Sequence, residues 1–139
     1  MRVVFDTNVF ISAFVVPGSQ GERAFVLALR RRFELFTSVP ILTETAGRLR
    51  AKFDQTEDDV KEALRRIGRI ATIVKPGRRL NVLSDAADNR ILECAVEAAA
   101  DVVVTGDRQL LRLRRLDRVS IVRLADFLRM FPEEEPGAR

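Results

Sequence analysis

Histidine is absent from the 139 residues, as are tryptophan and tyrosine, and cysteine occurs once. Without histidine the chain cannot form a Ser–His–Asp or Cys–His catalytic set, a zincin motif, or an imidazole base that works near neutral pH. Any acid–base chemistry is therefore left to carboxylates or to a metal-bound water.

The single cysteine, Cys94, lies in the apolar stretch 91–96 and has no second cysteine with which to form an internal disulfide. Its neighbours show no sign of activating a thiol, so we expect a core residue. Long apolar runs are missing as well, because Asp6 interrupts the N-terminal run before a signal-peptide core or a membrane span could form. We therefore expect a cytoplasmic protein with no membrane partner.

Lysine is scarce, since only Lys52, Lys61 and Lys75 stand among the 24 basic residues, and the net charge is +4. The rest are arginines, whose planar guanidinium donates two hydrogen bonds to a phosphate and is less strongly hydrated than an ammonium group. A polyanionic partner fits this composition. Solvated helix faces would account for many of the arginines equally well.

The chain has the usual size of one domain, and 47% hydrophobic residues can build one core. Short apolar runs that fit buried parallel strands alternate with segments of helical periodicity, which predicts an α/β fold. We expect one domain over 1–131 and a flexible acidic tail over 132–139. The predicted strands are 3–5, 33–37, 72–74, 102–104 and 119–122, and the main predicted helices are 22–32, 40–53, 57–70, 88–99, 108–113 and 124–130.

Two aspartates directly follow predicted strands. Asp6 ends the first apolar run, and Asp107 comes just after the run at 102–104. In an open parallel α/β sheet, ligands bind beyond the carboxyl ends of the strands, so both side chains lie where chemistry is expected. The competing interpretation is that each aspartate merely caps the helix that follows it.

Three further acids are less clear from periodicity. Asp88 has apolar residues three and four positions later, which puts its carboxylate on the core-facing side, where a charge needs a partner or a metal. Asp85 fits either a favourable charge at the helix amino end or a support for a metal site. Glu44 lies off the apolar stripe of its helix, so a helical wheel alone would leave it in solvent.

Four segments occur in a fixed order: FDTNV at 5–9, Glu44 early in a predicted helix, DNRILE at 88–93 and VTGD at 104–107. This order and spacing resembles the PIN-domain nucleases almost from end to end, and most closely the bacterial and archaeal members regarded as toxins of toxin–antitoxin pairs. The resemblance implies a three-layer α/β sandwich whose central parallel sheet of about five strands carries helices on both faces.

The resemblance also assigns roles to side chains. It implies that Mg²⁺ or Mn²⁺ is bound by four catalytic carboxylates, and oxygen ligands suit those ions better than zinc. It further implies a supporting set that holds these acids by hydrogen bonding. The four catalytic and metal-binding residues are Asp6, Glu44, Asp88 and Asp107, and the supporting residues are Asn8 and Thr105. Asp85 is a further candidate for the supporting set from its position one turn before Asp88, and not from the resemblance.

The implied activity is a metal-dependent endoribonuclease that leaves a 5′-phosphate and a 3′-hydroxyl. The expected partners are the RNA substrate, a cognate antitoxin and a second copy of the chain in a homodimer. The phenylalanines mostly fall in predicted core elements, so no platform for stacking bases is evident. The candidate phosphate contacts are Arg48, Arg90, Arg108 and Arg112.

Other classes also place acids at strand ends. A haloacid-dehalogenase phosphatase needs a second aspartate where Asn8 stands, and a phospho-accepting receiver needs a late lysine, which is absent after Lys75. Two alternatives stay open, a housekeeping RNA-processing nuclease and a non-catalytic module that binds RNA or an antitoxin.

Overall fold

The computed structural model describes residues 1–132, so the predicted acidic tail lies, apart from Pro132, outside the described residues. The strands are β1 (Arg2–Phe5), β2 (Glu34–Thr37), β3 (Ala71–Ile73), β4 (Val102–Thr105), β5 (Arg115–Leu116) and β6 (Val119–Arg123). The helices are α1 (Thr7–Val15), α2 (Gln20–Leu29), α3 (Val39–Phe53), α4 (Glu57–Ile70), α5 (Ala86–Glu97), α6 (Arg108–Leu113) and α7 (Leu124–Arg129).

The strands form one sheet in the order β3-β2-β1-β4-β6-β5. The five predicted strands are confirmed and are parallel, with Val4 opposite Phe36 on one side and Val103 on the other. The sheet is nevertheless mixed, because β5 pairs antiparallel with β6. A strand of two residues is too short to show the period-two alternation that would have predicted it.

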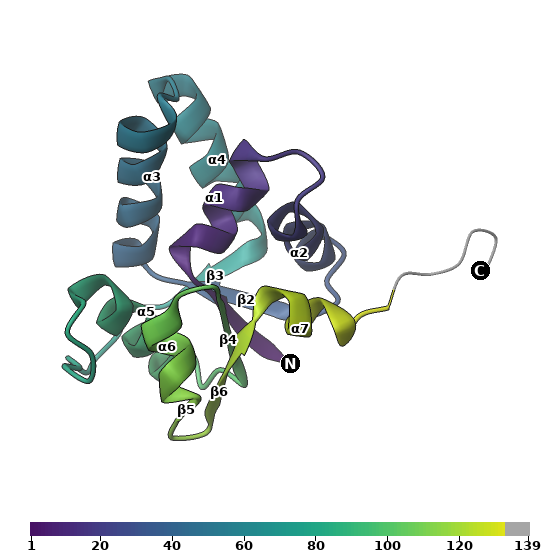
Figure 1. The fold of residues 1–139 in the computed structure, drawn as a ribbon. Helices are drawn as coiled ribbons and strands as arrows, with labels where there is room; N and C mark the ends of the chain where they lie inside the picture. The colour runs from purple at the N-terminus through teal and green to yellow at the C-terminus, as the bar shows by residue number, and fades with distance from the viewer. Residues whose placement is uncertain (133–139) are drawn as a thin grey trace.

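Helices cover both faces of this sheet, which confirms the predicted three layers (Figure 1). Helices α1, α2 and α7 pack together on one face, and α5 and α6 lie on the other. Both faces are therefore buried over the central strands. This double burial explains the uninterrupted apolar sequence of β1 and β4, since alternate side chains of each strand enter opposite layers.

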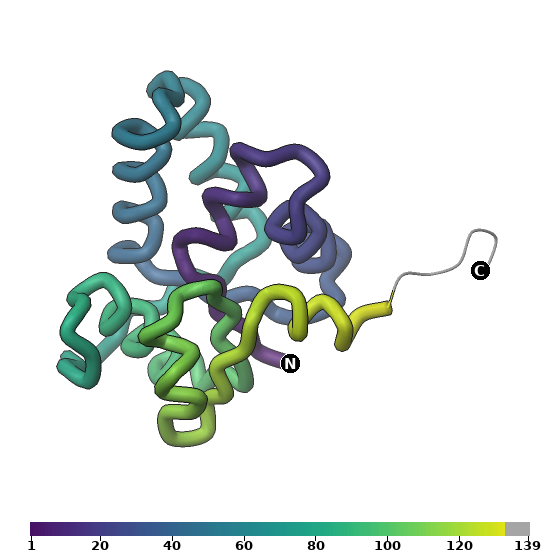
Figure 2. The backbone as a smooth tube through the Cα atoms, viewed as in Figure 1, coloured from purple at the N-terminus to yellow at the C-terminus, as the bar shows by residue number. Residues whose placement is uncertain are grey.

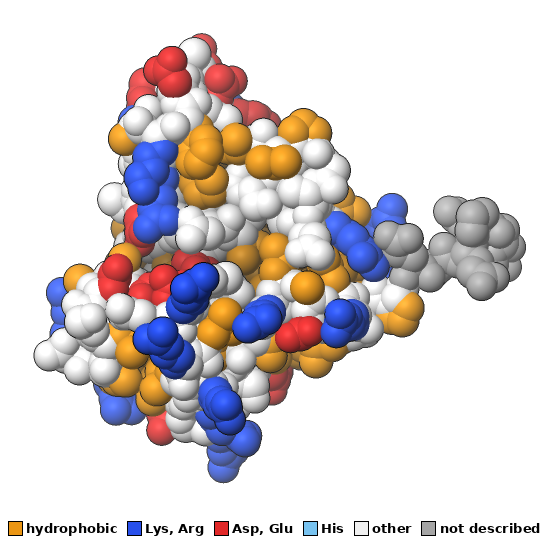
Figure 3. Space-filling view, in the orientation of Figure 1, with side chains coloured by type: hydrophobic (Ala, Val, Ile, Leu, Met, Phe, Trp, Pro, Cys, Tyr) orange, Lys and Arg blue, Asp and Glu red, His pale blue; other side chains and the backbone are white. Residues whose placement is uncertain are grey.

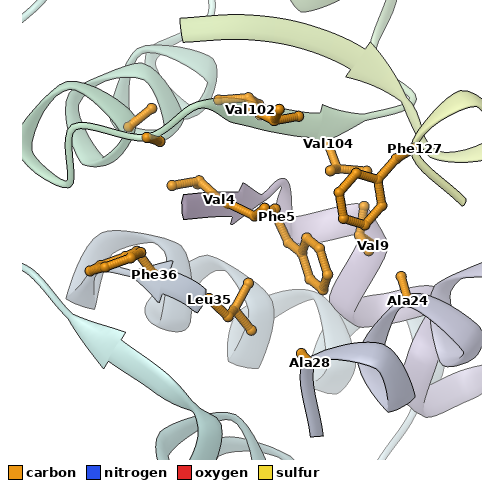
Figure 4. Packing of buried hydrophobic residues seen from close by; sticks show 14 of the residues in the cluster. Val4, Phe5, Val9, Ala24, Ala28, Leu35, Phe36, Val102, Val104 and Phe127 are labelled. Atoms are coloured by element: carbon orange, nitrogen blue, oxygen red, sulfur yellow. The ribbon is translucent and has the colours of Figure 1, made fainter. Parts of the chain in front are cut away.

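Phenylalanine rings fill the layer beneath α1, α2 and α7 (Figure 4). Phe5 contacts Phe10 edge-on, with ring centroids 5.5 Å apart, and its centroid lies 6.3 Å from that of Phe127. Close packing here also dictates Gly21 of α2, because a Cβ at this position would lie 2.7 Å from the Cβ of Ser12. The expectation that these aromatic residues serve the core is met at all three phenylalanines.

Helices α3 and α4 form a hairpin that extends away from the sheet (Figure 2). It has a small apolar cluster of its own, in which Leu49 of α3 and Val60 of α4 are fully buried beside Ile11 of α1. Thr56 caps α4 by accepting a hydrogen bond from the backbone of Asp59. No helix within residues 1–132 is both long and apolar enough to cross a lipid bilayer.

The strand order fixes where a ligand can bind. After β1 the chain continues through β2 to β3 on one side, and then returns across the sheet to β4 on the other side of β1. The carboxyl ends of β1 and β4 therefore border the point at which the direction of winding reverses. In open α/β sheets this point carries the ligand-binding crevice.

Candidate active site

Asp6 stands at the carboxyl end of β1, where its backbone N–H donates to the carbonyl of Val104 at 2.9 Å. It occupies the cap position of α1, but its side chain makes no capping hydrogen bond. Its Oδ2 instead accepts a hydrogen bond of 2.7 Å from the hydroxyl of Thr105, and only 6% of the residue is exposed. Helix capping therefore does not explain Asp6. Burial raises the pKa of this carboxyl, against the lowering effect of the Thr105 hydroxyl.

Thr105 connects Asp6 to the second strand-end acid. Its Oγ1 donates to Asp6 and accepts a hydrogen bond of 2.9 Å from the backbone N–H of Asp107. Asp107 does cap the following helix, because its Oδ1 accepts from the backbone of Gln109 and Leu110. Capping occupies one of the two carboxylate oxygens, so the cap and a role in a site are compatible.

Asp88 lies in the first turn of α5 and is 7% exposed, as its core-facing position predicted. Its Oδ2 is buried without a hydrogen-bond partner among the described residues. Burial and, after it, the nearby negative charges of Asp107, Asp85 and Asp6 raise the pKa of Asp88 to about 7. An ionised carboxylate in this place is unfavourable unless a cation or a proton compensates it.

Asp85 is the cap of α5 and is itself exposed. Its Oδ1 accepts hydrogen bonds from the backbone of Ala87 at 2.8 Å and of Asp88 at 3.3 Å. It thereby fixes the first turn of α5, in which Asp88 lies. The observed contacts combine the two interpretations of Asp85, a favourable helix-end charge and a support for a neighbouring acid.

Glu44 is less exposed than its helical wheel suggested, with 25% of its side chain accessible. One Nη of Arg48 lies 2.9 Å from its Oε1, and the other donates to Oδ1 of Asn8. Asn8 thus reaches Glu44 only through Arg48. Burial is the largest cause of the raised pKa of Glu44, which Arg48 lowers and Asp6 raises.

The structure gathers the predicted acids into one electrostatically coupled group. The negative charge of Asp107 contributes to the raised pKa of Asp6, and the charges of Asp6 and Asp107 both contribute to the raised pKa of Asp88. The charges of Asp6 and Asp85 likewise contribute to the raised pKa of Glu44. Figure 3 shows acidic side chains in the hollow between the α3–α4 hairpin and the body formed by α5 and α6, with basic side chains around them. Within residues 1–132, however, no three of the acids are arranged to enclose an ion directly.

The four candidate phosphate contacts have different surroundings. Arg90 binds Glu93 through Nε and Nη2, both at 2.8 Å, and 17% of its side chain is exposed. This pair holds the chain near Leu80, so we do not retain Arg90 as a phosphate contact. Arg48 is engaged with Glu44, whereas Arg108 and Arg112 are exposed and line a groove beside α6.

Sequence reasoning missed two features of this region. The pairing of Arg48 with Glu44 could have been predicted from the sequence, since residues four apart on a helix are neighbours. No pattern in the sequence predicts the role of Asn89. Its side-chain amide accepts hydrogen bonds from the backbone N–H groups of Val82 and Leu83 and donates one to the carbonyl of Leu83. This buried side chain fixes the loop before α5 and, with all three bonds directed at that loop, is not placed as a metal ligand.

Comparison with known proteins identifies the family and the fold of the chain. Residues 2–109 match the PIN domain. The chain is 32% identical over 119 residues to the uncharacterised protein MJ1680 of Methanocaldococcus jannaschii, covering 82% of this chain and 76% of that protein. In fold it is similar to a chain from VapBC2 of Rickettsia felis, solved with a DNA fragment from their promoter, with TM-score 0.63 and 15% identity, covering 88% of this chain and 98% of that one. The chain belongs to the PIN-domain family, a family of nucleases.

Proposed function

We propose that this chain is a Mg²⁺- or Mn²⁺-dependent endoribonuclease whose site consists of Asp6, Glu44, Asp88 and Asp107. The observation that carries the proposal is the buried Asp88 Oδ2, which has no hydrogen-bond partner among the described residues and lies beside the charges of Asp107 and Asp6. Such an oxygen is unfavourable by itself and suits a divalent cation.

The donor set fits such an ion. All four side chains offer carboxylate oxygens, the ligands that Mg²⁺ and Mn²⁺ prefer. Thr105 holds Asp6 from the side of β4, and Asp85 holds the turn that carries Asp88. Glu44 pairs with Arg48 through Oε1, which leaves its Oε2 for an ion.

A divalent ion held there would supply positive charge to a phosphodiester and to the water that attacks it. The chain's own residues position the reaction. Thr105 fixes the carboxyl group of Asp6, and Asp107 is held at the amino end of α6 by its cap. Arg48, which lies beside Glu44, can donate to a nonbridging phosphate oxygen. Attack by water on phosphorus, with the bond to the 3′ oxygen breaking and that oxygen leaving as a hydroxyl, gives 5′-phosphate and 3′-hydroxyl ends.

The direct test is RNA cleavage by the purified chain with Mg²⁺, Mn²⁺ or EDTA. Asp6→Asn keeps the shape of the side chain and removes its charge. Asp58→Asn makes the same change on exposed Asp58 of α4 and serves as the matched control. We expect metal-dependent cleavage by wild type and by the control, a loss of at least about 100-fold in Asp6→Asn, and 5′-phosphate ends. Equal cleavage by both variants, or cleavage in EDTA, would contradict the proposal.

We further propose that the chain acts as the toxin of a toxin–antitoxin pair and forms a homodimer. The PIN-family resemblance and the fold shared with a chain from VapBC2 support this assignment. Induced expression of wild type should arrest growth of its host, expression of Asp6→Asn should not, and a small protein encoded by a neighbouring gene should relieve the arrest. Growth at the normal rate during wild-type expression would favour a housekeeping nuclease instead.

A further inference from the structure

A basic groove runs along α6 beside the acidic site. It has a volume of about 640 Å³ and an apolar floor that includes Leu111 and Ile121. Its walls present four exposed guanidinium groups and a single carboxylate, Asp126, which pairs with Arg129 at 3.3 Å. We call this feature the α6 groove; its arginines are Arg108, Arg112, Arg114 and Arg123.

Two arginines of the α6 groove are neighbours of residues in the candidate active site. Arg108 is the first residue of α6 and directly follows Asp107. Arg123 lies on β6 in register with Thr105 of β4, the residue whose hydroxyl holds Asp6. A chain of phosphates lying over the carboxylates would therefore pass into this groove without leaving the surface.

The four arginines are uncompensated within the part of the chain that the structure describes. None of them makes a side-chain hydrogen bond or an ion pair with another residue between 1 and 132. Five arginines elsewhere are paired with carboxylates, namely Arg48, Arg50, Arg65, Arg90 and Arg129, so what distinguishes the groove is that four arginines unpaired within the described residues line one hollow. Four like charges around one groove repel each other and favour an anionic ligand with several charges.

The backbone of Arg114, one of the four arginines of the α6 groove, is held in a fixed position. Arg114 ends α6 with φ 61° and ψ −42°, a conformation that residues with a side chain rarely adopt. Its carbonyl accepts a hydrogen bond of 2.9 Å from the N–H of Ile121 on β6. The sheet thus holds Arg114 in place at the turn between α6 and the β5–β6 hairpin.

We propose that the α6 groove binds the sugar–phosphate backbone of single-stranded RNA next to the bond that is cut. This inference rests on the proposed ribonuclease function and extends it to the path of the substrate. Arginine forks match phosphate oxygens, and the apolar floor accepts the faces of sugars or bases. A groove between one helix and one strand admits a single strand, whereas an A-form duplex presents its phosphates on a broad convex surface.

The test measures binding rather than cleavage. Fluorescence anisotropy of a labelled single-stranded RNA in EDTA gives the Kd of wild type and of the double variant Arg112→Gln/Arg114→Gln. The matched control is Arg65→Gln/Arg69→Gln, which removes two exposed charges from α4. We expect the groove variant to bind at least about tenfold more weakly and to lower the slope of log K against log salt by about 1.4, at about 0.7 per lost phosphate contact. The control should stay within about twofold of wild type.

Several outcomes overturn the inference. If the groove and control variants bind RNA equally more weakly than wild type, the effect is due to net charge. If the groove variant binds RNA as tightly as wild type, the RNA does not pass through the α6 groove. Duplex RNA or a polyglutamate peptide that competes as well as the single strand would assign the groove to another partner. If Arg112→Gln/Arg114→Gln unfolds, Arg123→Gln is measured in its place.

The failure of this inference is separable from that of the proposed function. Groove-dependent binding in EDTA without any cleavage in Mg²⁺ or Mn²⁺ would support the groove and contradict the ribonuclease. Cleavage by the groove variant with an unchanged KM would support the ribonuclease and contradict the groove.

Discussion

At the scale of single residues, Thr105 links two of the candidate catalytic acids. One hydroxyl group donates to Asp6 and accepts from the backbone of Asp107, so it fixes both strand-end acids relative to each other. The residue is fully buried, and neither bond can be replaced by water without a rearrangement of the strand ends. Thr105 therefore couples the stability of the fold to the geometry of the site.

Replacing Thr105 with valine keeps its shape and removes both hydrogen bonds. We expect Thr105→Val to lower the free energy of unfolding by about 1–3 kcal/mol and to reduce kcat by about 10- to 100-fold with little change in KM. Thr105→Ser, which keeps the hydroxyl, should recover most of the loss in kcat. A serine variant with a lower kcat than the valine variant would show that the methyl group, and not the hydroxyl, is what the site needs.

Whereas Thr105 stabilises the fold, Asp88 in its ionised form destabilises the metal-free protein. Its pKa is raised to about 7 by burial and by neighbouring acids, so the folded chain holds a proton that the unfolded chain releases near the ordinary value of 3.8. Stability should therefore fall as the pH rises from about 4 to about 7.

The neutral variant Asp88→Asn should remove this pH dependence. In EDTA at pH 8 we expect it to unfold at a higher temperature than wild type, with a gain on the order of 1 kcal/mol, and to lose that advantage below pH 4. Thermal melts at both pH values, with Asp58→Asn as control, measure the difference. A variant no more stable than wild type at pH 8 would show that the Asp88 carboxylate is already compensated in the metal-free chain.

At the scale of elements, the loop between β3 and α5 is irregular in backbone yet tightly held. Three side chains of α5 bind its backbone N–H groups: Asn89 at Val82 and Leu83, Glu93 at Leu80 and Glu97 at Gly77. The loop leads into Asp85, which fixes the turn containing Asp88. One face of α5 thus positions the segment that carries a candidate catalytic acid.

Loss of the Asn89 amide should loosen this segment. We expect Asn89→Ala to lower the free energy of unfolding by about 2–3 kcal/mol, because its backbone partners are left without hydrogen bonds. Amide hydrogen exchange of residues 80–83 should accelerate more than that of the sheet. The exposed Asn81 lies on the same loop, so Asn81→Ala serves as the control and should change neither quantity. Unchanged exchange in Asn89→Ala would contradict this role.

Elements were predicted from the sequence where burial left a clear pattern. Strands β1 and β4 are buried on both faces, so their apolar runs stand out, and α4 has a sharply amphipathic face. The predicted helix over 22–32 overran the end of α2 at Leu29, because Arg31 adopts φ 58° and turns the chain toward β2. Periodicity could not identify Glu44, whose burial depends on the contact of α3 with α1 and α5, and residue patterns alone do not encode such contacts.

At the scale of the whole molecule, the site joins parts that are distant along the chain and would unfold together. A ligand that binds only the folded state stabilises it, by about 2.7 kcal/mol at a concentration 100 times its Kd. We therefore expect Mn²⁺ to raise the unfolding temperature of wild type by several degrees, and to raise that of Asp6→Asn much less. Equal shifts in both proteins would indicate an ion bound elsewhere.

The hydrogen bond between Thr105 and Asp6 spans 99 positions, and β1 can pair with β4 only after all the residues between them have been made. During translation Asp6 therefore leaves the ribosome 99 residues before Thr105, which belongs to the strand that completes its surroundings. A chain interrupted before residue 102 has a β1 edge but no β4 and no Thr105. The messenger that encodes this protein is therefore read through the codons of Thr105 and Asp107 before the product can assemble the site with which we propose it cuts RNA.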